Sequence, residues 1–220
     1  GFGTKPMRPH NMTLVMLGAG LLWFGWFGFN AGSALSAGTT ASVAWVNTLV
    51  ATAAAMLAWL LVERFRDGHP TSLGAASGVV AGLVAITPAA GSVSPVGAIF
   101  VGGIASAACA YAVGLKYKFG YDDSLDVVGV HFVGGLFGTV LIGLFADPNS
   151  PAGVAGLFYG GGVDQRWRQA VGAIAVTVYA FVVSYLIAML IKRTIGWRIT
   201  TADELSGIDL VEHSEAGYDL

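Results

Sequence analysis

Four long stretches of the chain contain no Asp, Glu, Lys or Arg: 11–62, 71–115, 127–146 and 169–191. About 20 apolar residues cross a bilayer, so each of the first two stretches is long enough for two crossings. Small polar residues and glycine interrupt these two stretches at 33–42 and 91–95, and such residues commonly end helices. The pattern therefore predicts six transmembrane helices, over residues 11–33, 41–63, 72–90, 95–116, 124–145 and 168–193.

Continuous apolar runs of this length favour helices, because a helix satisfies its own backbone hydrogen bonds in lipid. Strands of a membrane barrel would instead show ten-residue segments of alternating polarity. The expected fold class is all-α, a polytopic membrane helix bundle over residues 1–194. Residues 195–220 have a polar composition, with six of the 13 acidic residues of the chain, and are expected to form a tail outside the membrane.

Composition agrees with a membrane protein and excludes several other classes. Of the 220 residues 55% are hydrophobic and 11% are charged, against about 25% charged in soluble domains. The net charge of −2 gives no footprint for nucleic acid, and the single Cys109 excludes a disulfide scaffold and a multi-cysteine metal cluster. No signal peptide is expected, since no basic segment and cleavage site precede the first apolar run. With Gly1 as its first residue, the sequence is expected to be a fragment or a processed product.

The basic residues predict an orientation. If the six helices alternate in direction, nine basic residues fall on one side and two, Arg166 and Arg168, on the other. Lys and Arg are enriched on the cytoplasmic side of membrane proteins, so both ends of the chain are predicted to be cytoplasmic and 147–165 to be an outside loop. The nine are Lys5, Arg8, Arg64, Arg66, Lys116, Lys118, Lys192, Arg193 and Arg198.

Glycines recur at four-residue spacing within the predicted helices. Small residues on one helix face let neighbouring backbones approach closely in lipid, so the pattern predicts a tightly packed bundle. The glycines concerned are Gly74, Gly78 and Gly82, then Gly134 and Gly138, and also Gly28 and Gly32.

His131 is the only histidine inside a predicted span. An ionisable residue at membrane depth is costly and commonly faces a cavity or the interior of the bundle, so it is a candidate functional residue. The alternative is a core histidine that hydrogen bonds to a neighbouring helix. A metal site is not expected, because no second ligand lies at suitable spacing on the same face.

Asp126 lies five residues before His131, within the first turn of the predicted helix if Asp123 or Ser124 is its N-cap. A carboxylate there is stabilised by the unpaired N–H groups of the helix N-terminus, so a structural role is favoured over proton transfer. At about 1.5 Å per residue, His131 lies roughly 7–8 Å deeper than Asp126. Val127 shares the face of His131, one turn away.

Leu22, Trp26, Phe29 and Ser33 form a single stripe along the first predicted helix, at i, i+4, i+7 and i+11. One interpretation is an aromatic belt at the membrane interface. The other is a site for a small ammonium-like cation, because two aromatic rings and a hydroxyl attract such a cation, with about 2 kcal/mol from cation–π contact when partly desolvated. The spacing leaves both interpretations open.

Several motifs resemble the second half of the ammonium transporter (Amt/Mep/Rh) family, in the same order along nearly the whole chain. They are the segments GWFGFNAGS (25–33), VNT (46–48), GLVAITP (82–88), DDSLDVVGVH (122–131) and EAGY (215–218). The resemblance implies a fold of eleven helices with an inverted repeat, a homotrimer with one pore per subunit, and helices six to eleven in this chain.

The resemblance also implies roles for individual residues. Phe29 matches one of two phenylalanines that gate the pore, and Ser33 matches the hydroxyl of the outer ammonium-recruitment site. Leu22, Trp26 and Val127 match pore-lining residues, His131 matches the second of two pore histidines, and Asp126 matches a structural acid. The first histidine, the second gating phenylalanine and the outer tryptophan belong to the other half of the family fold.

The expected function is transport of ammonium or ammonia across the plasma membrane, with a PII-type signalling protein as a possible partner at the cytoplasmic face. Alternatives are a membrane ammonium sensor and a non-conducting structural fragment. The sequence has no nucleophile–base constellation and no cofactor motif, so neither an enzyme nor a cofactor is expected.

Overall fold

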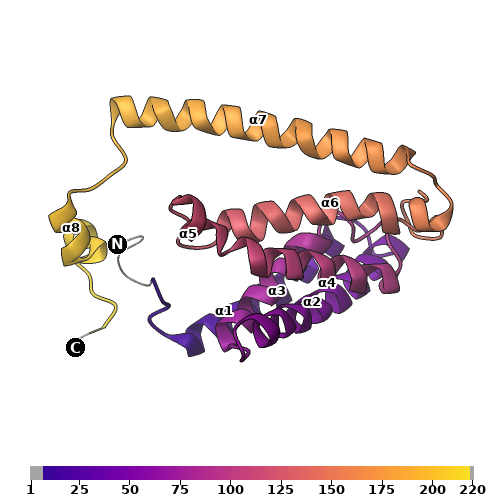
Figure 1. Cartoon of the computed structure of the whole chain (residues 1–220), viewed down its shortest axis with the longest axis horizontal. Coiled ribbons are helices and arrows are strands. Elements are labelled where there is room, and N and C mark those ends of the chain that lie inside the picture. Colours follow the sequence, from indigo (N-terminus) through magenta and orange to yellow (C-terminus); the bar gives the residue numbers. More distant parts are fainter. Residues whose placement is uncertain (1–6, 219–220) are drawn as a thin grey trace. The chain divides into compact units, whose positions relative to one another are not determined.

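The computed structural model describes residues 7–218 and is helical throughout, with no β-strand in that range beyond an isolated bridge between Val93 and Ala146 (Figure 1). Its contacts divide the chain into two units, residues 1–174 and 175–220, which are described separately. Lys5, one of the nine residues in the predicted charge pattern, lies outside the described residues.

The first unit is a bundle of helices that pack closely on one another. Helices α2, α3, α4 and α6 pack together, and α1 packs against α2 and α3. The helices are α1 (Met12–Gly32), α2 (Thr39–Arg66), α3 (Ser72–Ile86), α4 (Pro95–Ala112), α5 (Leu115–Phe119), the π-helical turn η1 (Val127–Phe132), α6 (Val133–Phe145), the 3-10 turn η2 (Leu157–Tyr159) and the first part of α7 (Asp164–Thr194).

The second unit holds the rest of α7, which ends at Thr194, and the tail. The tail contains two short helical segments, α8 (Thr201–Ser206) and η3 (Asp209–His213). The Thr200 hydroxyl accepts a hydrogen bond from the Asp203 N–H at 3.2 Å, which begins α8 as an N-cap. These two helical segments were not predicted from the sequence.

All six predicted helices are present, but their lengths differ from the prediction. Five are long and apolar enough to cross a membrane, whereas α3 has only 15 residues and stops at Ile86, four residues before its predicted end. The helix predicted over 95–116 is interrupted, since α4 ends at Ala112 and the five-residue α5 follows it. The helix predicted over 124–145 begins only at Val127, and its first six residues form a π turn.

At the end of α3 the chain continues as turns up to α4, and polar groups hold these turns in place. The buried Asn47 of α2 donates to the carbonyl oxygens of Ala90 at 2.8 Å and Val93 at 2.7 Å. From the other side, the Asp147 N–H donates to Ser92 O at 2.9 Å. The loop after α6 is therefore attached to the α3–α4 connection and is not a free surface loop.

Two glycines mark where helices touch backbone to backbone. A Cβ added at Gly102 of α4 would collide with the carbonyl of Ala51 on α2, and one added at Gly138 of α6 would collide with the carbonyl of Ala85 on α3. The predicted close packing is thus confirmed at Gly138, and also at Gly78 and Gly82, which pack against α2. At Gly28 and Gly32 it is wrong for this chain, since nothing lies within 4 Å of an added Cβ.

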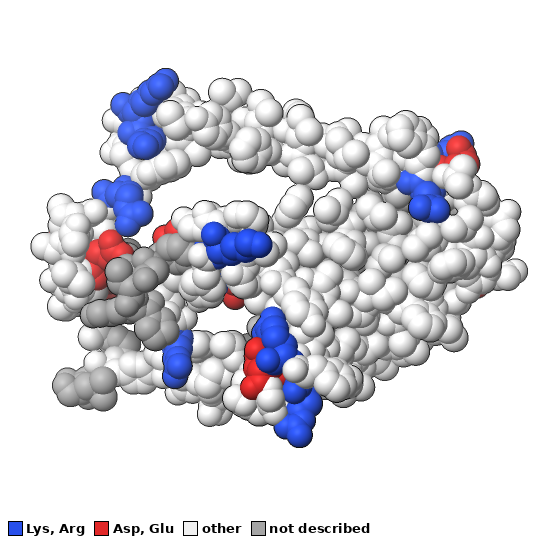
Figure 2. Space-filling view, viewed as in Figure 1, with Lys and Arg blue, Asp and Glu red and all other residues white. Residues whose placement is uncertain are grey.

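Charged side chains of the first unit concentrate near helix ends, and the surface between them is uncharged on the face shown (Figure 2). Arg66 and Lys116 line one pocket, and Arg8 and Lys116 line a second hollow. We call this end of the first unit the basic end. Arg166 packs against Gly143, near the opposite end of α6.

Candidate functional site

The stripe on α1 is tied to the rest of the bundle by hydrogen bonds that start at Trp26. Its indole Nε1–H donates to Thr87 Oγ1 at 2.8 Å, and the Thr87 hydroxyl lies 3.1 Å from Asn30 Oδ1. Asn30 Nδ2 donates to Thr48 Oγ1 at 2.9 Å, and the Thr48 hydroxyl donates to Ala44 O at 2.7 Å. These bonds link α1, α2 and the end of α3 and fix the orientation of the Trp26 ring.

Phe29 and Ser33 lie toward the C-terminal end of the same stripe. The Phe29 ring is 5.2 Å from the Trp26 ring, centroid to centroid, and tilted by 53°, and Phe29 is 58% exposed. Ser33 comes directly after α1, and its hydroxyl donates to Phe29 O at 2.5 Å. An exposed phenylalanine beside an oriented tryptophan, with a hydroxyl one turn on, is an arrangement that can contact a small cation.

His131 lies in the π turn η1 and faces a hollow of about 760 Å³ at the basic end. Leu22 of α1 lines the same hollow, so the structure brings together two of the residues singled out in the sequence. The wall between them is mostly apolar and small, with Ala76, Ser77 and Val80 from α3. Val127 is 54% exposed and is not among the residues that line this hollow.

Asp126 also lines the hollow, but its place in the helix differs from the prediction. It lies just before η1 in a left-handed backbone conformation, φ +56°, and its side chain makes no capping hydrogen bond. Asp123, one of the two N-cap candidates, provides the cap, since its two carboxylate oxygens accept from the N–H groups of Val127 at 2.7 Å and Val128 at 2.9 Å. Asp126 pairs with Lys116, with its Oδ1 2.6 Å from the ammonium nitrogen.

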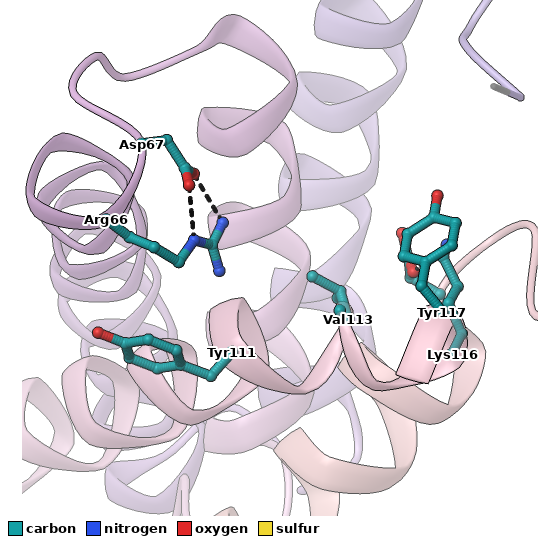
Figure 3. A pocket seen from close by; sticks show the side chains of 8 residues that line it. Arg66, Asp67, Tyr111, Val113, Lys116 and Tyr117 are labelled. Carbon is teal, nitrogen blue, oxygen red and sulfur yellow. Dashed lines mark hydrogen bonds and ion pairs between the residues drawn. The ribbon is translucent and has the colours of Figure 1, made fainter. Parts of the chain in front are cut away.

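Next to this hollow lies a second pocket of about 480 Å³ (Figure 3). Two side-chain ion pairs line it, Arg66 with Asp67 and Lys116 with Asp126. The Arg66 guanidinium donates to both carboxylate oxygens of Asp67, at 2.8 and 2.7 Å, and to Ala110 O at 2.5 Å. The hydrogen bonds from Arg66 hold the pKa of Asp67 below its ordinary value. Lys116 and Asp126 line this pocket as well, so their ion pair lies between the two hollows.

Sequence reasoning missed most of the groups that hold this site together. Asn30, Asn47, Thr48 and Thr87 lie in the motifs that carried the family resemblance, yet no role was assigned to them. A signal was present, because an amide or hydroxyl inside an otherwise apolar span needs a hydrogen-bond partner there. Lys116 was counted only as a surface charge, although its side chain is 8% exposed.

These features define a class: a multi-pass membrane protein whose helices carry a histidine-lined hollow and an aromatic pair oriented by buried polar groups. Comparison with known proteins identifies the family. The profile of the Ammonium Transporter Family matches residues 2–218, so the chain belongs to this family.

Curated relatives agree with this assignment. The chain is 59% identical over 226 residues to an ammonium transporter of Mycobacterium tuberculosis, which covers 100% of this chain and 47% of the relative. An ammonium transporter of Aquifex aeolicus is 51% identical, over 96% of this chain and 50% of its own length. The chain thus spans about half the length of the curated relatives it matches.

Solved structures confirm the all-helical membrane fold. The crystal structure of Candida albicans Mep2 superposes with a TM-score of 0.83 and 34% identity, over 91% of this chain and 46% of that one. A structure described as a sensor Amt protein superposes with a TM-score of 0.84 and 31% identity, over 92% of this chain and 49% of that one.

Proposed function

We propose that this chain forms one side of a pore that transports ammonium or ammonia across the cell membrane. The observation that carries the proposal is the hollow that Leu22 and His131 share, with mostly apolar walls and charged residues at the basic end. The membership in the ammonium transporter family supports it. The remaining wall of the pore, with the first pore histidine, is supplied by a matching half.

The chemistry of the residues fits this task. Moving a bare ammonium ion into low dielectric costs several kcal/mol even after relaxation, more than the roughly 2 kcal/mol of a cation–π contact. The ion is therefore recruited at Ser33 and Phe29, loses its proton near the gate, and passes the apolar wall of Leu22, Trp26 and Val127 as ammonia. His131, with a partner imidazole, provides ring nitrogens that can bind ammonia and relay the proton.

Replacing Phe29 tests the gate. In the chain assembled with a matching first half, Phe29→Ala is expected to change the flux or its selectivity between ammonium and methylammonium. It should leave assembly intact, because the ring is 58% exposed in this chain. If Phe29 were a core residue, its removal would instead cost about 3–5 kcal/mol of stability. Flux and thermal melting, measured on the same preparation, separate the two roles. A lowered melting temperature with unaltered selectivity would contradict the gate.

The orientation is a second prediction. Arg8, Arg66 and Lys116 share the basic end, and Arg166 lies toward the other end of α6, so we expect the basic end to be cytoplasmic. In intact cells a membrane-impermeant thiol reagent should label Ala152→Cys directly, but His69→Cys and Ser214→Cys only after permeabilisation. Native Cys109 is buried and serves as the unlabelled background. Labelling of position 69 in intact cells would reverse the proposed topology.

A sensor is the second candidate, favoured by the likeness to the structure described as a sensor Amt protein. A sensor would bind ammonium at Ser33 and Phe29 and signal through residues 195–220. Flux that depends on His131 in an assembled pore would favour transport over sensing. By family resemblance we also propose a homotrimer and a PII-type protein docking at the cytoplasmic face.

A further inference from the structure

The turn that carries His131 is an unusual element. η1 is a π turn over Val127–Phe132 that continues directly into α6. A π turn contains one residue more than the matching α-helical turn, so converting it to α-helix would rotate the residues before it by about 100° relative to α6. The direction in which His131 points therefore depends on whatever keeps this turn in its π form.

Two aspartates hold the beginning of the turn. The Asp123 carboxylate accepts from the N–H groups of Val127 and Val128, which lack partners within the helix. Asp126 has φ +56°, a conformation that a residue with a side chain adopts rarely and at some cost. Such a conformation persists only where neighbouring groups impose it.

Lys116 is the group that bonds to both aspartates. Its ammonium, on a side chain 8% exposed, donates to Asp126 Oδ1 at 2.6 Å and to the Asp123 carbonyl oxygen at 2.9 Å. The lysine belongs to α5, which follows α4 after two residues. A buried ammonium is stable only with such partners, so breaking these contacts is costly and they hold 123–126 in a fixed position.

The turn also packs on the helix that precedes α5. A Cβ added at Gly129 would lie 2.8 Å from Val113 Cα, and Cys109 Sγ lies 3.6 Å from Val130 O. The end of α4, Lys116 and the π turn thus form one connected structure, and Lys116 lines the same hollow as His131.

We propose that Lys116 is a positioning residue for His131: through Asp126 and Asp123 it maintains the π turn that directs the imidazole into the hollow. The inference rests on the proposed function of the hollow as a pore. It adds Lys116, at the basic end of the hollow, to the residues on which conduction depends.

The test uses the chain assembled with the matching first half of the Mycobacterium tuberculosis relative, and methylammonium uptake per molecule as the readout. Lys116→Met should lower the maximal rate about tenfold or more, since a misplacement of about 1 Å at a reacting group has effects of this size or larger. The half-saturation concentration should stay unchanged, because Ser33 and Phe29 are not touched. Lys116→Arg should recover part of the rate. Lys118→Met, an exposed lysine of the same short helix, is the matched control and should behave as the unaltered chain.

A second measurement separates this inference from the proposed function. Amide hydrogen exchange over 127–132 should become about tenfold faster in Lys116→Met and stay unchanged in Lys118→Met. If the unaltered assembly gives no uptake while exchange differs in this way, the proposed function fails and the role of Lys116 in holding the turn stands. Equal exchange and equal maximal rates in Lys116→Met and the unaltered chain would overturn the inference.

Lys116→Met leaves the Asp126 carboxylate without its cation, which is destabilising by itself. The double variant Lys116→Met with Asp126→Asn removes both charges and is expected to restore assembly. A positioning role predicts that the assembled double variant still transports about tenfold slower. Uptake at the full rate by the double variant would show that Lys116 only neutralises Asp126, and would overturn the inference.

Discussion

Reconstituted alone in liposomes, the 220-residue chain is expected to give no ammonium-driven pH change beyond that of empty vesicles. The residues assigned to the pore are open on one side, since Phe29 is 58% and Val127 54% exposed and His131 is exposed as well. In transporters built from inverted repeats the substrate site lies between the two halves. With one half alone, ammonia meets no closed apolar tunnel and the cation meets no closed gate.

Co-reconstitution with the first half of the Mycobacterium tuberculosis relative should restore flux, and His131→Ala should abolish the restored part. A vesicle assay with an internal pH dye measures all three samples. Flux from the single chain that depends on His131 would show that two copies rebuild a pore. In that case the proposal that the pore requires a different half would be wrong.

The second large effect is a loss of stability expected at Gly102 but not at the adjacent Gly103. Gly102→Ala should lower the stability of the chain in detergent by about 3 kcal/mol or more, because the added Cβ collides with the Ala51 carbonyl and backbone cannot move aside cheaply. For a chain of this size the loss corresponds to about 10 °C in Tm.

Gly103→Ala is the matched control, since nothing lies within 4 Å of its added Cβ. There the higher helix propensity of alanine should raise stability by up to about 1 kcal/mol. Melting curves of both variants measure the difference. Equal shifts of the same sign would mean that α2 and α4 are not in backbone contact at Gly102.

The positions of the helices were predictable because a single physical requirement, the absence of charge over a bilayer-length segment, determines them. The end of α3 at Ile86 had a local signal that the predicted span 72–90 passed over, since Pro88 lacks an N–H and disfavours helical backbone in the residue before it. The bonds from Asn47 of α2 that hold the following turns were not predictable, because they form only after the helices pack. The π turn was also hidden, since nothing local in 127–132 distinguishes it from an α-helix. Its cause lies in Lys116, eleven residues earlier in the sequence.

For the site, only the family resemblance assigned Leu22 and His131 to one pore, because the two residues lie on different helices; in this structure they line one hollow. The spacing of Trp26 and Phe29 on one face was predictable from helical periodicity, and their ring contact follows from it. The hydrogen bonds that orient Trp26 were not predictable, since Trp26 reaches Thr87, and Thr87 reaches Asn30, only after α1 packs on α3.

The short α3 has a consequence for how the chain enters the membrane. At about 1.5 Å per residue its 15 residues reach roughly 22 Å, short of the bilayer core of about 30 Å. By itself it is a poor substrate for partitioning from the insertion machinery into lipid, and the carbonyls that follow it need Asn47 of α2. We therefore expect α3 to insert stably only together with α2, which supplies these hydrogen bonds.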